Sequence, residues 1–238
     1  MLVLALDTTN EKGGVGIFRA GQCLASVPNH GPANRYSVTL FQMLDQALQE
    51  SRLHLADIEL FAVANGPGSF TGIRVGLAAA QGWGRAFDRP VRGVSVLEAM
   101  VEEAQPETEW AVPVLDARRG EFFLRLFRRA SDDASGGRAF VPEGEGWVLK
   151  PAGMLGFLRD HLPSQAGVSC LVREHDLAAF NLREHLPASF HWQRIPGTLL
   201  APIARLGVAA HQMGRSSAPA ELDAYYIRRP DAEVNWKG

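Results

Sequence analysis

The stretch FAVANGPGSFTGIRVGLAAAQGWGRAF, residues 61–87, is typical of a buried strand, a glycine-rich turn and a helix. This order of elements often binds phosphate, because the start of a helix presents free N–H groups. No lysine follows the glycines, which excludes a Walker loop, and the spacing G-x-G-x-x-x-G from Gly66 is one residue too long for the dinucleotide fingerprint. We therefore favour a strand-to-helix connection with Ser69 or Thr71 as N-cap over a direct phosphate site.

The helix of this stretch carries an unusual series of small residues. Each glycine inside a helix costs about 1 kcal/mol relative to alanine, so the series indicates that another backbone comes close. That backbone belongs either to the same lobe, such as the helix expected over residues 35–50, or to another subunit. Polar side chains form one narrow stripe, at Arg74, Gln81 and Arg85. The small residues recur every fourth position, at Gly72, Gly76, Ala80 and Gly84.

The first 105 residues predict a mixed α/β lobe of the ribonuclease-H type. Three apolar runs form a meander, and helices and strands alternate after it, in the order β-β-β-α-β-α-β-α. The helix over residues 35–50 is amphipathic, with Tyr36, Leu40 and Leu44 at four-residue spacing. The strands are expected at residues 2–6, 14–18, 23–27, 60–64 and 90–96.

The second half begins with a similar unit, because WAVPVLDARRGEFFLRLF (110–127) places Asp116 in a strand–turn–strand as the start of the chain places Asp7. This is either a faint internal duplication or the ordinary likeness of two hairpins. We divide the chain into a lobe of residues 1–105 and a smaller, degenerate lobe of residues 106–238. Within the second, we expect an exposed loop at 131–146, helices at 151–161 and 199–213, and a strand at 167–172.

Composition narrows the class of protein. The chain has 238 residues, 46% of them hydrophobic and 21% charged, as in ordinary globular proteins. A net charge of -2 argues against a protein that grips nucleic acid alone. The two cysteines, far apart, indicate no disulfide framework and favour a reducing cytosol. The N-terminus does not predict a signal peptide, and no apolar run is long enough for a membrane span.

Candidate chemical groups are few. Asp7, Thr8 and Thr9 end the first strand, where they could position a metal-bound nucleotide or simply cap a turn. No two of the seven histidines are three or four residues apart, so we expect no helical metal pair. No G-x-S-x-G elbow supports a serine nucleophile.

Across nearly its whole length the sequence resembles the TsaB family, bacterial partner subunits of the tRNA threonylcarbamoyladenosine machinery. The most specific of the matching motifs is ANGPGSFTGIRVGLAAAQG, the loop and helix quoted first. The others are LALDTT at the start, RYSVTLFQMLDQAL, GVSVLEAM at 93–100, VLDARRGEFF at 114–123 and YYIRRP near the end.

The resemblance implies a two-lobed fold of the actin, sugar-kinase and heat-shock ATPase type with a reduced second lobe. It implies a cytoplasmic protein with no catalytic residue, metal or cofactor of its own. Its partners would be a TsaD-like catalytic subunit and a TsaE-like ATPase, which together attach threonylcarbamoyl to N6 of adenosine 37 in tRNAs that read codons starting with A. The tRNA would be met only through this complex, and the isolated chain could form a homodimer.

The resemblance also implies that pairing uses the first-lobe helices. The interface residues expected here are Tyr36, Leu40, Leu44, Gly72, Arg74, Gly76, Ala80, Trp83 and Gly84. ATP with magnesium could sit at a junction of the complex. The nucleotide-binding candidates in this chain are Asp7, Thr8, Thr9, Gly66, Gly68 and Ser69.

Two positions depart from the family pattern. Tyr36–Ser37 stands where members commonly have a His-Ser pair, and VREHD (172–176) lacks the glycine of a second-lobe turn. Two other functions stay open at this point. One is a small two-lobed kinase that uses Asp7 on a metal nucleotide, and the other is a metal-dependent protease, against which the histidine spacing argues.

Overall fold

The fold was analysed in a computed structural model, which describes residues 1–32, 35–130, 139–173, 190–214 and 222–227. The chain divides into two compact units. The first consists of Met1–Ala99 together with Thr198–Gly238, and the second of Met100–Gly197.

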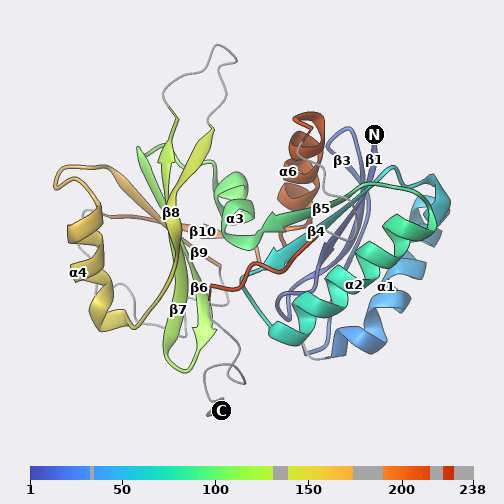
Figure 1. Cartoon of the computed structure of the whole chain (residues 1–238), viewed down its shortest axis with the longest axis horizontal. Coiled ribbons are helices and arrows are strands. Elements are labelled where there is room, and N and C mark those ends of the chain that lie inside the picture. The colour runs from blue at the N-terminus through green and yellow to red at the C-terminus, as the bar shows by residue number, and fades with distance from the viewer. Residues whose placement is uncertain (33–34, 131–138, 174–189, 215–221, 228–238) are drawn as a thin grey trace. The chain divides into compact units, whose positions relative to one another are not determined.

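The first unit is built on a five-stranded mixed sheet with the order β3-β2-β1-β4-β5 (Figure 1). The antiparallel meander pairs β1 with β2 and β2 with β3, and the parallel part pairs β1 with β4 and β4 with β5. The predicted order of elements over residues 1–105 is confirmed, with one short 3-10 turn (Leu55–Asp57) added. The elements are β1 (Leu2–Asp7), β2 (Gly14–Arg19), β3 (Gln22–Pro28), α1 (Tyr36–Ser51), β4 (Leu60–Gly66), α2 (Phe70–Ala86), β5 (Val91–Ser95) and α3 (Val96–Ala104).

Both faces of this sheet are covered by helices. Side chains alternate along a strand, so Leu4 and Val63 point into a core with α1 and α2, whereas Val3 and Ala62 face α6 (Leu200–Gln212) on the opposite side. Strands buried on both faces read as continuous apolar runs, which is why β1 and β4 carry so few polar residues.

The second unit repeats this topology, with the order β10-β9-β6-β7-β8. Here β6 pairs antiparallel with β7 and parallel with β9, as β1 pairs with β2 and β4. The shared order and sense of the two sheets supports an internal duplication. The elements are β6 (Trp110–Arg118), β7 (Glu121–Arg129), β8 (Phe140–Leu149), α4 (Pro151–His161), β9 (Val168–Arg173) and β10 (His191–Ile195).

Two expectations about the second half need correction. Of the loop expected at 131–146, residues 131–138 lie outside the described residues, and residues 140–146 belong to β8. Strand β8 is the last in its sheet among the described strands, and an edge strand tolerates residues such as Pro142, Gly144 and Gly146. The short strand β10 was not predicted, and with it this unit keeps five strands, so its sheet is not reduced.

The units also divide the chain differently from the expected boundary after residue 105. The segment from Thr198 groups with the first unit, because α6 packs against β1, β4 and β5. None of the described helices is both long and apolar enough to cross a membrane.

Candidate functional site

The small-residue series of α2 faces the inside of the first unit. The Thr8 hydroxyl donates a hydrogen bond to the Gly72 carbonyl, with 2.7 Å between the two oxygens. A Cβ atom on Gly72 would collide with the Thr8 carbonyl, and one on Gly76 with the Thr8 side chain. The backbone whose approach the glycines indicate is therefore the turn after β1 of the same unit.

Burial divides the nine expected interface residues into two groups, and their role in pairing stays a prediction. The sequence pattern indicated a close approach, but it could not tell which neighbour approaches. Arg74 is exposed and Trp83 is partly exposed, so these two lie on the outer side of α2. The other seven are buried in the first unit: Tyr36, Leu40, Leu44, Gly72, Gly76, Ala80 and Gly84.

A second series of small residues occupies the outer side of α2. It recurs at steps of four, three and four residues, the spacing of one helix face. Gly82 has open space where its Cβ would be, so this face is uncovered at that point. Three of the four residues are exposed and Val75 is half-buried; the four are Thr71, Val75, Ala78 and Gly82.

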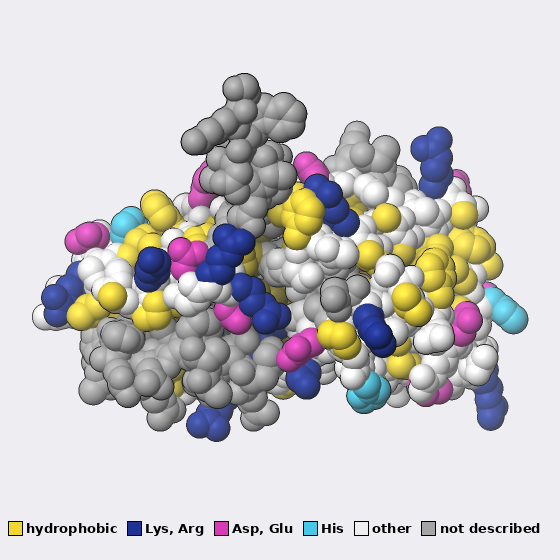
Figure 2. All heavy atoms as spheres, turned by 90° about the horizontal axis from the view of Figure 1, so that it is seen from below, with side chains coloured by type: hydrophobic (Ala, Val, Ile, Leu, Met, Phe, Trp, Pro, Cys, Tyr) yellow, Lys and Arg dark blue, Asp and Glu magenta, His cyan; other side chains and the backbone are white. Residues whose placement is uncertain are grey.

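Large apolar side chains lie exposed on the neighbouring helix. On α1, Val38 is 67% and Phe41 57% exposed. Phe41 meets Trp83 edge to face, with ring centroids 6.1 Å apart, so the outer sides of the two helices join. Val38, Phe41, Thr71, Val75, Ala78, Gly82 and Trp83 are called the α1–α2 face below. Figure 2 shows hydrophobic side chains gathered on the first unit with scattered charged groups.

The side chain of Asp7 accepts hydrogen bonds from residues of the turn that follows it. Its side chain is fully buried, and one carboxylate oxygen accepts hydrogen bonds from the Thr9 backbone (3.0 Å) and hydroxyl (2.6 Å). The other oxygen accepts one from the Asn10 amide at 3.2 Å. These contacts correspond to the turn-capping interpretation of Asp7. A metal-bound nucleotide would need the same oxygens.

The glycine-rich loop before α2 is joined to that turn. The Ser69 backbone donates to the Thr9 carbonyl at 2.7 Å, and the Ser69 hydroxyl caps the helix by accepting from the Gly72 backbone. A Cβ on Gly68 would collide with Thr9. The structure thus brings five of the six nucleotide candidates together at the two loops, where their contacts hold the loops to each other and to the start of α2. The sixth, Gly66, lies against Tyr225 instead. Ser69, one of the two expected N-caps, is the N-cap.

The unusual Tyr36 has a defined role in the same region. Its hydroxyl donates to the Asn10 carbonyl at 2.7 Å, and its ring, at the start of α1, is buried in the core of the first unit. Of the VREHD segment, Val172 and Arg173 are buried at the end of β9, and residues 174–176 lie outside the described residues. No group of three or more His, Cys, Asp or Glu side chains suited to a metal occurs in the described ranges.

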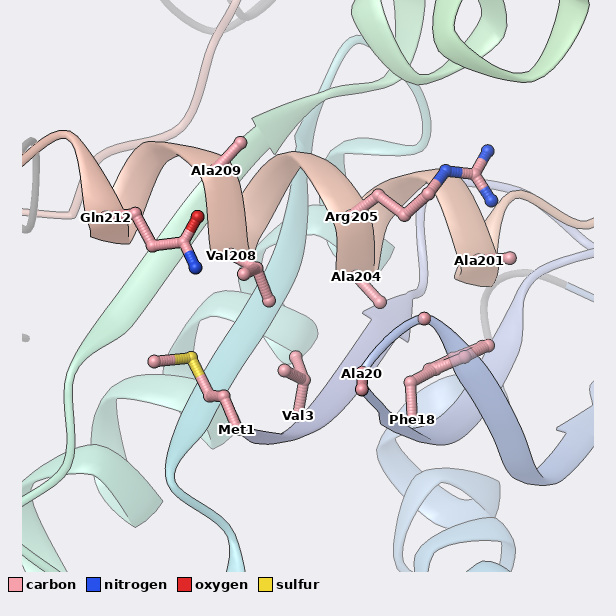
Figure 3. Close-up of a pocket in the computed structure, with 11 residues that line it drawn as sticks. Met1, Val3, Phe18, Ala20, Ala201, Ala204, Arg205, Val208, Ala209 and Gln212 are labelled. Carbon is pink, nitrogen blue, oxygen red and sulfur yellow. The ribbon is translucent and has the colours of Figure 1, made fainter.

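Two features near the sheet were not foreseen. The first is the C-terminal segment Leu222–Ile227, whose Tyr226 accepts a hydrogen bond from Arg74 of α2. The motif YYIRRP marked the segment, but sequence alone gives no partner for it. The second is an apolar pocket of about 350 Å³ between α6 and the β1–β2 hairpin, lined by Val3, Phe18 and Val208 among others (Figure 3). The Arg205 head group points away from this pocket.

Comparison with known proteins gives matches over much of the chain. The family model described as "TsaD: tRNA N6-adenosine threonylcarbamoyltransferase" matches residues 27–144. The Bacillus subtilis tRNA threonylcarbamoyladenosine biosynthesis protein TsaB is 30% identical over 128 residues, 54% of this chain and 56% of that protein. The Haemophilus influenzae protein of the same name is 34% identical over 126 residues, 52% of each. The chain thus spans about half the length of the curated relatives it matches.

Solved structures match more of the chain. A Pseudomonas aeruginosa protein with similarity to peptidase YEAZ aligns with a TM-score of 0.73 at 23% identity, over 95% of this chain and 99% of that one. YeaZ from the same organism gives 0.72 at 22% identity, over 94% and 99%. This likeness confirms the predicted fold class. The curated matches named TsaB support the resemblance to the TsaB family that the sequence motifs indicate.

Proposed function

We propose that this chain is a non-catalytic subunit that binds and activates a TsaD-like enzyme, which adds threonylcarbamoyl to N6 of adenosine 37 of tRNAs reading codons that start with A. The relatives' names tie the family to threonylcarbamoyladenosine biosynthesis. The observation that carries the partner-binding role is the uncovered α1–α2 face.

The chemistry of that face suits a helical partner. Small residues at helical spacing let another backbone approach closely, and the Phe41–Trp83 pair offers aromatic area of the kind enriched in interface cores. The family model that matches residues 27–144 is named for the threonylcarbamoyltransferase itself. Such a partner would present related helices, so the two chains could pair in a pseudo-symmetric way, and two copies of this chain could pair likewise.

The contacts of Asp7 favour this role over the alternative of a small kinase. A kinase of this fold would need a carboxylate that reaches the metal nucleotide, whereas the Asp7 oxygens accept hydrogen bonds from Thr9 and Asn10. We therefore propose that ATP with magnesium, the TsaE-like ATPase and the tRNA bind to the assembled complex rather than to this chain alone. We place that complex in the cytoplasm.

Two substitutions that introduce a charge test whether the α1–α2 face binds the partner. Phe41→Arg and Ala78→Arg place a cation on it, and each should weaken binding to the TsaD-like subunit of the same organism by at least about tenfold, because an unpaired charge would be desolvated. Met213→Arg is the matched control, since Met213 is 66% exposed and follows α6 on the other side of the sheet. Titration calorimetry measures the affinities.

Circular dichroism and the thermal midpoint verify that each variant is folded. If the folded Phe41→Arg and Ala78→Arg variants both bind the TsaD-like subunit with the affinity of the native chain, the α1–α2 face is not the docking surface. The kinase alternative predicts micromolar binding of magnesium ATP to the isolated chain and loss of that binding in Asp7→Ala. Sedimentation of the native and Phe41→Arg chains then shows whether the same face makes a homodimer.

A further inference from the structure

The described C-terminal segment Leu222–Ile227 (red in Figure 1) runs along α2 as an extended strap. Its backbone is held from two elements. The Tyr225 N–H donates to the Asn65 carbonyl at 2.8 Å, and the Asn65 amide donates back to the Asp223 carbonyl at 3.2 Å. From α2, the Gln81 amide donates to the Leu222 carbonyl at 2.9 Å. The strap is thus fixed to residues about 150 positions earlier in the sequence.

Two glycines keep room for this strap. Gly66 has φ +126°, which disfavours other residues, and a Cβ there would lie 2.5 Å from the Tyr225 carbonyl. A Cβ on Gly93 would lie 2.7 Å from the Leu222 side chain. The path of the strap is therefore encoded in β4 and β5 as well as in the strap itself.

Tyr226 organises the exposed side chains at the start of α2. Its hydroxyl accepts a hydrogen bond from Arg74 Nε at 3.2 Å, and its ring lies 5.3 Å from that of Phe70, centroid to centroid. The Arg74 guanidinium carbon in turn lies 3.8 Å from the centroid of the Phe70 ring. This Phe70–Arg74–Tyr226 stack borders the α1–α2 face, because Arg74 lies three residues after Thr71 and four before Ala78 on neighbouring positions of the helix surface.

We infer that the strap is part of the partner-binding surface and that Tyr226 is a positioning residue for Arg74. The inference rests on the proposed function and names a new component of the same site. One Arg74 donor is used by Tyr226, and the remaining N–H groups of the guanidinium fork are suited to carboxylate or carbonyl oxygens of the partner. A free arginine loses rotamer entropy when it binds, and a stacked, hydrogen-bonded one has already lost most of it.

A double-mutant cycle tests this role on the full chain, with affinity for the TsaD-like subunit as the readout. Tyr226→Phe keeps the ring but removes the hydroxyl, and should weaken binding about threefold; Tyr226→Ala also frees Phe70 and should weaken it about tenfold. Because Tyr226 acts through Arg74, Arg74→Ala with Tyr226→Phe should bind within about twofold of Arg74→Ala alone. Met213→Ala is the control, since Met213 is 66% exposed and follows α6, outside both the strap and the α1–α2 face.

The outcomes separate this inference from the proposed function. Native affinity in Tyr226→Ala, or fully additive effects of Arg74→Ala and Tyr226→Phe, would overturn the positioning role. If Phe41→Arg abolishes binding of the partner and Tyr226→Ala leaves the affinity unchanged, the strap is excluded from the interface and the α1–α2 face is not. If neither substitution changes the affinity, the α1–α2 face is excluded as well. A general loss of stability is recognised by the thermal midpoint, and Tyr226→Phe keeps the test valid should Tyr226→Ala not fold.

Hydrogen exchange gives a readout that does not depend on substitution. The Tyr225 amide is bonded to Asn65, and an irregular strap opens more easily than the helices beside it. Binding of the partner should slow exchange at Tyr225 and Tyr226 by at least about fivefold if the strap lies in the interface. Unchanged exchange at both amides in the saturated complex would contradict the inference.

Discussion

The hydroxyl of Thr8 donates a hydrogen bond to the carbonyl of Gly72 across 64 positions of sequence, with 2.7 Å between the oxygens. This contact joins the turn after β1 to the first turn of α2 in the buried interior. It requires the two backbones to approach so closely that no side chain fits on α2 opposite Thr8. Gly72 and Gly76 are thus required by the fold, whereas the small residues on the outer side of α2 are available for another role.

The two sides of α2 should respond in opposite ways to the same substitution. Gly76→Ala forces a methyl group against the Thr8 side chain, and we expect a loss of about 1–3 kcal/mol in the free energy of unfolding. Gly82→Ala meets open space and should gain up to about 1 kcal/mol from helix propensity. Urea unfolding measures both, and equal effects at the two positions would contradict the orientation of the helix.

Much of the fold could be predicted because the relevant signals are local. The apolar run of β4, the N-cap Ser69 and the four-residue spacing in α1 each determine an element by neighbouring residues. Strand β8 was missed because its Pro142 and its glycines resemble a loop, and only pairing with β7 makes the segment a strand.

The candidate site was predicted less well, because orientation is a tertiary property. A glycine series shows that something approaches a helix, and Thr8 turned out to be that neighbour rather than a second chain. The outer series at Thr71, Ala78 and Gly82 lies in the same helix, but it is less regular than the glycine series and was not recognised from the sequence. The contact between Tyr226 and Arg74 joins positions 152 residues apart, and no local pattern reports such a pair.

Asp7 and Asp116 provide a matched pair, since they lie on the corresponding strands β1 and β6 of the two sheets. Asp7→Asn should lower the free energy of unfolding by about 1–3 kcal/mol. An amide has only one acceptor oxygen, so it cannot accept hydrogen bonds from both Thr9 and Asn10 as the two carboxylate oxygens do. Asp116→Asn should cost less than about 0.5 kcal/mol, because the contact of Asp116 with the Arg118 backbone is exposed and needs one acceptor. Chemical denaturation compares them, and a neutral Asp7→Asn would show that the turn does not need the carboxylate.

The two cysteines should differ in reactivity and in their effect on stability at high pH. Burial raises the pKa of the Cys170 thiol from 9.0 to about 12, whereas Cys23 is exposed. A thiol reagent at pH 8 should therefore modify one cysteine per folded chain and both in urea. A raised folded-state pKa stabilises the folded state below pH 9.0, and this contribution is lost as the pH rises from 9.0 towards 12.

By pH 10 that loss should be about 1 kcal/mol. Tyrosines and lysines titrate in the same range, so Cys170→Ala is the control that isolates the thiol: its free energy of unfolding should fall less steeply above pH 9 than that of the native chain. Parallel pH profiles for the two chains, or rapid modification of both cysteines in the folded state, would show that Cys170 is open to solvent and that β9 is not packed as described.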